Sequence, residues 1–227
     1  MTKEKLWHSC NLFIITEAIL FVLIQTLPGS TRYLEYGSII LACLFFFTFR
    51  EKSKSYVFTQ IGLLFTIVAD YFLVFSEQQN KLAGVVFFLF AQTAYFLRIA
   101  FEEKNSTVLK IHLVTRFVLP IPIIIATFFV LGDNTDLLAL VSMVYFTNLF
   151  LNIVFSMAGS KKSRLLTLGL VFFILCDTFV GLGQMDMYFN IAEGSLIYTL
   201  LHSNINLVWF FYVPSQTLLA LSLMPDD

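Results

Sequence analysis

The sequence is poor in charge. Asp, Glu, Lys and Arg together make up 13% of its 227 residues, whereas an ordinary soluble domain has roughly 25%. The formal net charge is −1, and the basic residues are scattered along the chain instead of forming a binding stripe. These shortages argue against an ordinary soluble domain, and they give no electrostatic reason to expect nucleic acid as a partner.

Cysteine is also scarce. Cys10, Cys43 and Cys176 are odd in number, widely spaced and placed inside apolar runs. Neither a disulfide framework nor a zinc site has this pattern. We therefore expect packed thiols, and we expect chemistry that needs no metal and no other cofactor.

The residues present in excess are apolar, at 58% of the chain. A helix that crosses a bilayer needs about 20 such residues in succession. Suitable runs lie near 9–27, 36–49, 56–75, 83–101, 113–131, 137–157, 165–184 and 204–224. They predict an all-α fold, a polytopic bundle of eight transmembrane helices, with residues 1–227 forming a single integral membrane domain.

The charges between these runs predict the orientation of a multi-pass protein. Nearly all the basic connecting residues fall on one side of the expected membrane: Lys3, Lys5, Arg50, Lys52, Lys54, Lys104, Lys110, Lys161, Lys162 and Arg164. The other side has only Arg32 and Lys81. Because cytoplasmic loops carry the excess of Lys and Arg, we expect both termini in the cytoplasm, which requires an even number of crossings.

Two aspartates, Asp70 and Asp177, lie deep inside apolar runs and are the first candidates for function. A carboxylate there costs about 3 kcal/mol even on a lenient insertion scale. The surrounding segments 62–73 and 169–180 are identical at six of twelve positions. Because residues 87–93 also resemble 210–217, we expect two parallel four-helix repeats, 1–112 and 113–227.

Other polar side chains share helix faces and should point inward, because the bilayer offers them no partner. They are Gln92, Tyr95, Asn148, Asn152, Tyr212 and Gln216. Together they are expected to line a wet cavity around the acids, although each amide could equally well only hydrogen-bond a neighbouring helix. Arg98 and Arg116 are expected to extend to the lipid headgroups, and His112 is expected to be solvated.

Paired carboxyl groups suit acid–base hydrolysis. If Asp70 and Asp177 approach each other, their repulsion and their removal from water leave one protonated and the other ionised. A protonated carboxyl donates a proton, and a carboxylate orients water, so the pair needs no metal. The alternative is a silent pair that only hydrogen-bonds across helices.

Four short motifs together resemble the YhhN-type lysoplasmalogenase family of integral membrane proteins. They are Phe65-Thr66-x-x-Ala69-Asp70-x-x-Leu73, Gly84-x-x-x-Phe88-x-x-Ala91-Gln92-x-x-Tyr95, Gly169-x-x-x-Phe173-x-x-Cys176-Asp177 and Tyr212-x-x-Ser215-Gln216-x-Leu218. The chain departs from the family pattern at Gln92, where the family often has His, at Ala69, where Gly is common, and at Cys176, where Ser is common.

The resemblance implies an activity and a substrate. It implies eight helices and hydrolysis of the vinyl ether bond of lysoplasmalogens, which yields a fatty aldehyde and a glycerophospho-base. Asp70 and Asp177 would be catalytic, and the six inward polar residues would bind a lysophospholipid drawn from the membrane. Because both acids lie in the outer half of the bilayer, the headgroup is expected near the outer surface.

Two rival classes use buried acids. A proton-coupled transporter or carrier of a small or lipid-like solute is the main alternative, although the third and seventh runs lack the mid-membrane proline that broken transporter helices often contain. An intramembrane aspartyl protease fits less well, because the residues flanking Asp70 and Asp177 do not show that family's motifs.

Overall fold

The computed structural model describes residues 3–46, 53–76, 80–158, 164–185, 188–189, 191–203 and 205–222, and the regular structure in these ranges is helical. Of the basic residues used to predict orientation, Arg50, Lys52, Lys161 and Lys162 lie outside the described residues. The all-α prediction is confirmed.

The helices follow one another through short connections. They are α1 (Lys3–Thr26), α2 (Arg32–Phe46), α3 (Lys54–Asp70), the π-helix η1 (Tyr71–Phe75), α4 (Lys81–Glu102), α5 (Ser106–Val118), α6 (Pro120–Leu131), the 3-10 helix η2 (Gly132–Asn134), α7 (Leu137–Ala158), α8 (Arg164–Gln184), α9 (Leu196–Leu201) and α10 (Leu207–Leu221). Each of the eight apolar ranges expected from the sequence overlaps one of these helices or a continuous pair of them.

Six helical segments in the described part of the chain are long and apolar enough to cross a membrane. They are Lys5–Thr26, Lys54–Phe75, Lys81–Glu102, Ser106–Asn134, Leu137–Ala158 and Arg164–Gln184. The fourth combines α5 and α6, which meet at Leu119–Pro120, where proline opens the second helix because it has no N–H to donate. α10 is a shorter apolar helix of 15 residues, and α2 also has 15.

Side-chain caps fix several helix starts. The side chain of Ser53 accepts a hydrogen bond from the backbone N–H of Tyr56 and so caps α3. Asn80 caps α4 in the same way, and Asn105 caps α5. Each satisfies N–H groups that the first helical turn leaves without a partner.

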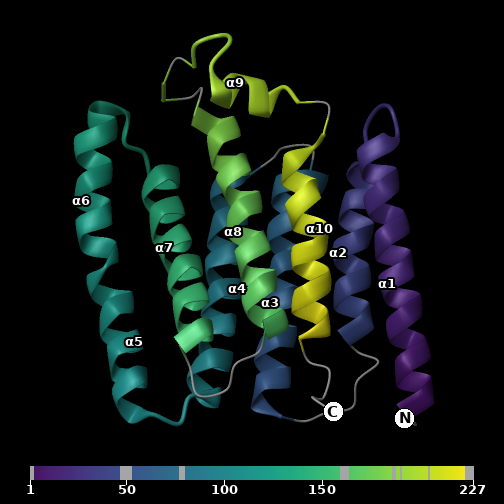
Figure 1. The fold of residues 1–227 in the computed structure, drawn as a ribbon. Coiled ribbons are helices and arrows are strands. Elements are labelled where there is room, and N and C mark those ends of the chain that lie inside the picture. The colour runs from purple at the N-terminus through teal and green to yellow at the C-terminus, as the bar shows by residue number, and fades with distance from the viewer. Residues whose placement is uncertain are drawn as a thin grey trace.

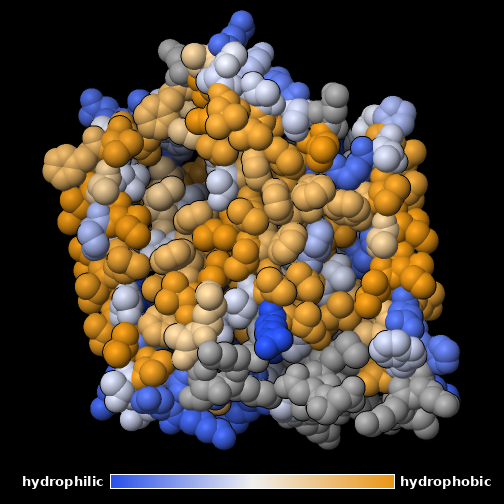
Figure 2. Space-filling view, viewed as in Figure 1, coloured by the Kyte–Doolittle hydropathy of each residue, from blue (hydrophilic) through white to orange (hydrophobic). Residues whose placement is uncertain are grey.

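Figure 1 shows α3, α4, α8 and α10 in the middle of the bundle, with α1 and α2 on one side and α5, α6 and α7 on the other. α9 lies across one end, and α1 begins at the opposite end, where α10 finishes. Figure 2 shows a wide apolar belt between polar ends. On that belt Phe117 is 74% exposed and Phe129 is 86% exposed, which fits side chains that face lipid and not water.

Two glycines let the central helices approach closely. A Cβ atom added at Gly62 of α3 would lie 2.6 Å from the Tyr95 ring of α4. One added at Gly169 of α8 would lie 2.9 Å from the Leu219 side chain of α10. Only a residue without a side chain permits either approach, so these positions set the spacing of α3 with α4 and of α8 with α10.

Arg98 was expected to extend to the headgroups, and this is wrong. Its side chain is 2% exposed and donates hydrogen bonds to the Thr59 hydroxyl at 3.0 Å and to the Ser222 hydroxyl at 2.6 Å. It also donates to the Ser222 carbonyl at 2.9 Å. The guanidinium therefore joins α3, α4 and the end of α10, because its fixed fork of donors suits several oxygen acceptors at once.

Candidate active site

Asp70 is the last residue of α3, at the point where that helix passes into the π-helix η1. Its side chain is 2% exposed, and the Tyr212 hydroxyl of α10 donates a hydrogen bond to Asp70 Oδ2 at 2.5 Å. Short π-helical turns are rare and often occur at functional sites. The carboxyl group is thus held by a partner that comes from 142 residues further along the chain.

Asp177 has a matching arrangement on α8. It is half-buried and accepts a hydrogen bond at Oδ2 from the Tyr145 hydroxyl of α7. Each acid therefore has one tyrosine partner, and each tyrosine comes from a different helix. Tyr145 belongs to the same helical stripe as Asn148 and Asn152, and it was expected to face the interior with them, although it was not assigned to catalysis or to substrate binding.

A shared aromatic ring brings the two pairs together. The Phe88 ring of α4 has its centroid 5.8 Å from the Tyr145 ring and 6.4 Å from the Tyr212 ring. Phe173 of α8 packs against both Phe88 and Tyr212, at 5.5 Å in each case. The helices thus bring both acids to one place, packed between aromatic rings.

Arg116 of α5 forms the centre of a second polar cluster. It was expected to extend to the headgroups, but it turns inward and donates to Asn148 Oδ1 and, at 2.5 Å, to Asn152 Oδ1. Its guanidinium also lies 3.0 Å from His112 Nε2 and 4.2 Å from the centre of the Phe96 ring. Both predicted asparagines therefore hold an arginine that the sequence interpretation had placed at the membrane surface.

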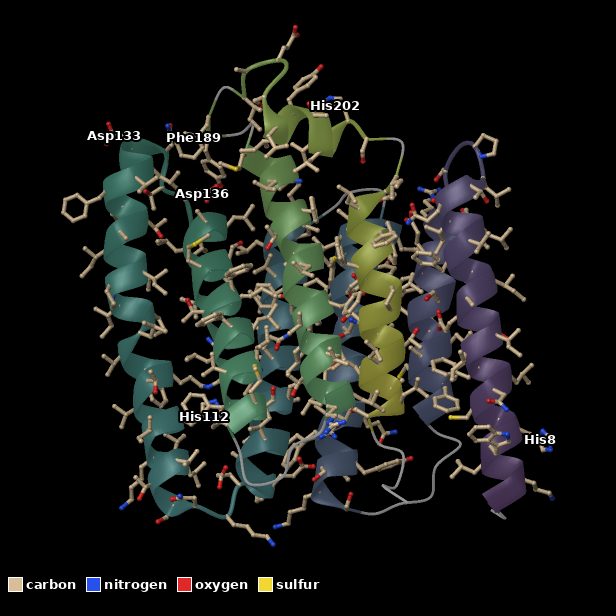
Figure 3. The ribbon with its side chains drawn as sticks, in the orientation of Figure 1. His8, His112, Asp133, Asp136, Phe189 and His202 are labelled. Carbon is tan, nitrogen blue, oxygen red and sulfur yellow. The ribbon has the colours of Figure 1, made fainter. Side chains whose placement is uncertain are left out.

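His112 was expected to be solvated, and this is also wrong. It is 2% exposed, and its ring stacks on Phe155 of α7 with the centroids 3.8 Å apart. Figure 3 shows its side chain directed from α5 toward α7. The signal was available in the sequence, because His112 and Arg116 are four residues apart and share one helix face. A charge at the edge of an apolar run is itself a candidate functional group.

Gln92 connects this cluster to α4. The Asn152 amide donates to the Gln92 backbone carbonyl at 2.9 Å and to its side-chain oxygen at 3.0 Å. The Gln92 side-chain nitrogen has no hydrogen-bond partner among the described residues, although the residue is 0% exposed. Native proteins seldom leave a buried donor unused, so this nitrogen is a candidate contact for a water molecule or a ligand.

The remaining predicted residues differ in their surroundings. Both amide atoms of Gln216 on α10 are buried without a hydrogen-bond partner among the described residues. Tyr95 is completely buried, and its ring fills the space beside Gly62. His202, which is not among the predicted site residues, lies at the α9 end and stacks on Tyr198, away from both clusters (Figure 3).

The fold and the site define a helical membrane protein with two acids inside the helix bundle, one buried and the other half-buried. The YhhN family model matches residues 32–223, so the chain belongs to the YhhN family, which is associated with lysoplasmalogenase activity. The match runs from α2 through α10 and confirms the resemblance seen in the four motifs. A search of curated proteins and a search of solved structures each gave no match.

Proposed function

We propose that this protein is a lysoplasmalogenase, which hydrolyses the vinyl ether bond of lysoplasmalogens to a fatty aldehyde and a glycerophospho-base. The observation that carries the proposal is that Asp70 and Asp177 are each held by a tyrosine hydroxyl, and that the two tyrosine rings pack against the same Phe88 ring. Family membership supports the same activity.

The reaction needs one proton donor and one group that handles water. A carboxylic acid protonates the vinyl carbon that does not carry oxygen, which gives an oxocarbenium ion. Water adds to the oxygen-bearing carbon and gives up a proton to the second carboxylate. The resulting hemiacetal releases the glycerol oxygen as an alcohol and the chain as an aldehyde. Proton transfer by positioned carboxyl groups and stabilisation of the cation by a carboxylate suffice for these steps.

The tyrosines orient the acids for this chemistry. Tyr212 and Tyr145 each donate to Oδ2, which fixes the plane of each carboxyl group and leaves Oδ1 for the substrate or for water. Gln92 and Gln216 have amide groups without partners, and we assign these groups to water and to the glycerol oxygens. Tyr95, Asn148 and Asn152 complete the set that would surround the substrate.

The proposal includes eight membrane crossings with both termini in the cytoplasm. α2 and α10 would then cross as short helices, and α5 with α6 would cross once. The first residue of α1 and the last of α10 lie at the same end of the bundle, as an even number requires (Figure 1). Lys5, Lys54, Lys110 and Arg164 lie at that end too, by their places in the helices, and Lys104 lies in the connection between α4 and α5 at the same end.

The proposed parallel repeat gains support from packing. Gly62 and Gly169 are matched positions in the repeated segments, and their close neighbours Tyr95 and Leu219 each lie three residues after a matched glutamine. Equivalent glycines therefore meet equivalent positions of the following apolar helix. A chain built from two copies of one four-helix unit has this property.

The test is hydrolysis by the purified protein in detergent. Alkenyl, alkyl and acyl lysophospholipids are supplied separately, and released aldehyde and fatty acid are measured. We expect aldehyde from the alkenyl substrate only, and loss of this activity in Asp70→Asn and in Asp177→Asn. Asp136→Asn is the matched control, because Asp136 also accepts a tyrosine hydroxyl, from Tyr188 at 3.1 Å, but at the α9 end.

Two outcomes of these experiments would contradict the proposal. Full activity in one of the two site variants would remove that aspartate from the mechanism. Uptake of a solute into intact vesicles, without hydrolysis in detergent, would instead identify a carrier.

A further inference from the structure

The Arg116 cluster contains a half-buried positive charge without a negative partner among the described residues. The contacts of the guanidinium are two asparagine oxygens, a histidine ring nitrogen and the face of Phe96. In the described part of the chain no carboxylate forms an ion pair with it. A cation removed from water is costly unless a charge or several hydrogen bonds compensate it, so this place is electrostatically suited to an anion.

Two donors of the cluster are unused. Arg116 Nε and the Gln92 side-chain nitrogen are both buried without a hydrogen-bond partner among the described residues. Gln92 is 0% exposed, and its side-chain oxygen accepts from Asn152, so the amide nitrogen is oriented by a bond that already exists. An anion with several oxygens could accept from both donors, and guanidinium groups bind such anions with two bonds at once.

The distance from this cluster to the acids can be worked out along α7. Tyr145, which holds Asp177, precedes Asn148 by three residues and Asn152 by seven. At about 1.5 Å of rise per residue, the two asparagines lie roughly 4.5 and 10.5 Å from Tyr145 along the helix axis. Arg116 bridges both asparagines and therefore lies between these levels, about 7 to 8 Å along the helix axis from Tyr145, whose hydroxyl holds Asp177.

A lysoplasmalogen has a phosphate at a matching distance from its reactive carbon. Seven bonds separate the vinyl carbon that receives the proton from the phosphorus atom. An extended chain advances at most about 3.6 Å for every three bonds, which gives about 8 Å for seven. A substrate with its vinyl ether at the acids would therefore place its phosphate beside Arg116.

We propose that Arg116, supported by Asn148, Asn152 and His112 and joined by the Gln92 amide, binds the phosphate of the lysophospholipid headgroup. This inference rests on the proposed function for the identity of the lipid. It directs the headgroup toward the end of the bundle where α1 begins, which is opposite to the direction expected from the depth of the acids. It also makes the phosphate a determinant of substrate choice.

The first experiment compares two substrates that differ only in the phosphate. Purified full-length protein, in a maltoside detergent that contains no phosphate, is given a 1-alkenyl lysophospholipid or the corresponding 1-alkenylglycerol. In Arg116→Lys the KM for the lysophospholipid should rise about tenfold more than the KM for the alkenylglycerol, because lysine cannot form the two-bond contact. An equal rise in both KM values would overturn the assignment.

The matched control is Arg98→Lys. Arg98 is an arginine of the same half of the bundle that turns inward too, but its hydrogen-bond partners are Thr59 and Ser222. We expect it to change the two KM values by the same factor. If Arg98→Lys discriminates between the substrates as strongly as Arg116→Lys, the effect is structural and the site is wrong.

A second experiment does not depend on turnover. The thermal unfolding midpoint is measured with a 1-alkyl lysophospholipid, with the matching alkylglycerol and with inorganic phosphate, because a ligand that binds the folded state raises the midpoint. Only the alkyl lysophospholipid should raise it strongly, and Arg116→Lys should lose that shift. If inorganic phosphate alone gives the whole shift, or if alkylglycerol gives the same shift, the headgroup site is wrong. If the lysophospholipid shift is found but neither alkenyl substrate is cleaved, the hydrolase proposal fails and the phosphate site stands.

Discussion

Removal of one hydroxyl group, in Tyr212→Phe, should slow the reaction without disturbing the packing. The variant deletes the hydrogen bond to Asp70 Oδ2 and keeps the ring, whose centroid lies 5.2 Å from Trp209 and 5.5 Å from Phe173. As Asp70 gives up its proton to the substrate it becomes negatively charged, and a hydrogen bond to a charged group contributes about 1.5 to 3 kcal/mol. If that bond orients Asp70 for proton transfer, its loss lowers kcat by about 10- to 100-fold, since 1.36 kcal/mol is tenfold in rate.

The assay is release of aldehyde from an alkenyl lysophospholipid, with kcat and KM determined separately. We expect KM to change little, because Tyr212 contacts the acid and not the headgroup. Tyr188→Phe is the matched control, since it removes a tyrosine–aspartate hydrogen bond at the α9 end. If Tyr212→Phe retains the wild-type kcat while remaining folded, the idea that this hydroxyl positions Asp70 is wrong.

Three further predictions concern packing and orientation. Gly62→Ala should lower the free energy of unfolding by about 1 to 3 kcal/mol, because its Cβ would overlap the Tyr95 ring. The control Gly181→Ala should leave the free energy of unfolding unchanged, because nothing lies within 4 Å of the added Cβ. Equal thermal midpoints for the two variants would contradict the close approach of α3 and α4. Arg98→Met should lower the thermal midpoint more than either glycine variant, because Thr59 and Ser222 both lose a buried partner. An unchanged midpoint would show that the hydrogen bonds of Arg98 do not stabilise the bundle. Glu193→Cys should react with a membrane-impermeant thiol reagent from outside the cell, whereas Lys104→Cys should react only after the cells are permeabilised. The reverse result would invert the proposed topology. The native cysteines are all buried and should not interfere.

The sequence predicted the helices well because apolar runs and their charged ends are local signals. It was less able to place the polar side chains. Arg98 and Arg116 both lie toward helix ends, where the long side chain can reach the headgroups, and this was the expectation for each. In the structure Arg98 finds Thr59 and Ser222, and Arg116 finds Asn148 and Asn152. Partners from distant helices decide the direction of such a side chain, and local sequence does not identify those partners.

The candidate site also contains residues that the sequence reveals and residues that it does not. Asp70 and Asp177 could be found because a charge in an apolar run is unusual wherever the fold places it. Tyr145 could not be chosen over other tyrosines, since its role depends on a hydrogen bond to Asp177, 32 residues away. An arginine in an apolar run of a membrane protein therefore merits the same attention as an acid there. The sequence did indicate that Arg116 belongs to a polar helix face, because His112 lies four residues before it.

The unequal burial of the two acids predicts their roles. Asp70 is 2% exposed, whereas Asp177 is half-buried on α8, and Figure 2 shows the surface hollowed between α6 and α8 below α9. Water would reach Asp177 first, so we expect Asp177 to orient water and Asp70 to donate the proton. In D2O, Asp177→Asn should then still protonate the vinyl carbon reversibly, and deuterium should enter the uncleaved substrate at that carbon. Asp70→Asn should give neither exchange nor cleavage, and exchange found only in Asp70→Asn would reverse the two roles.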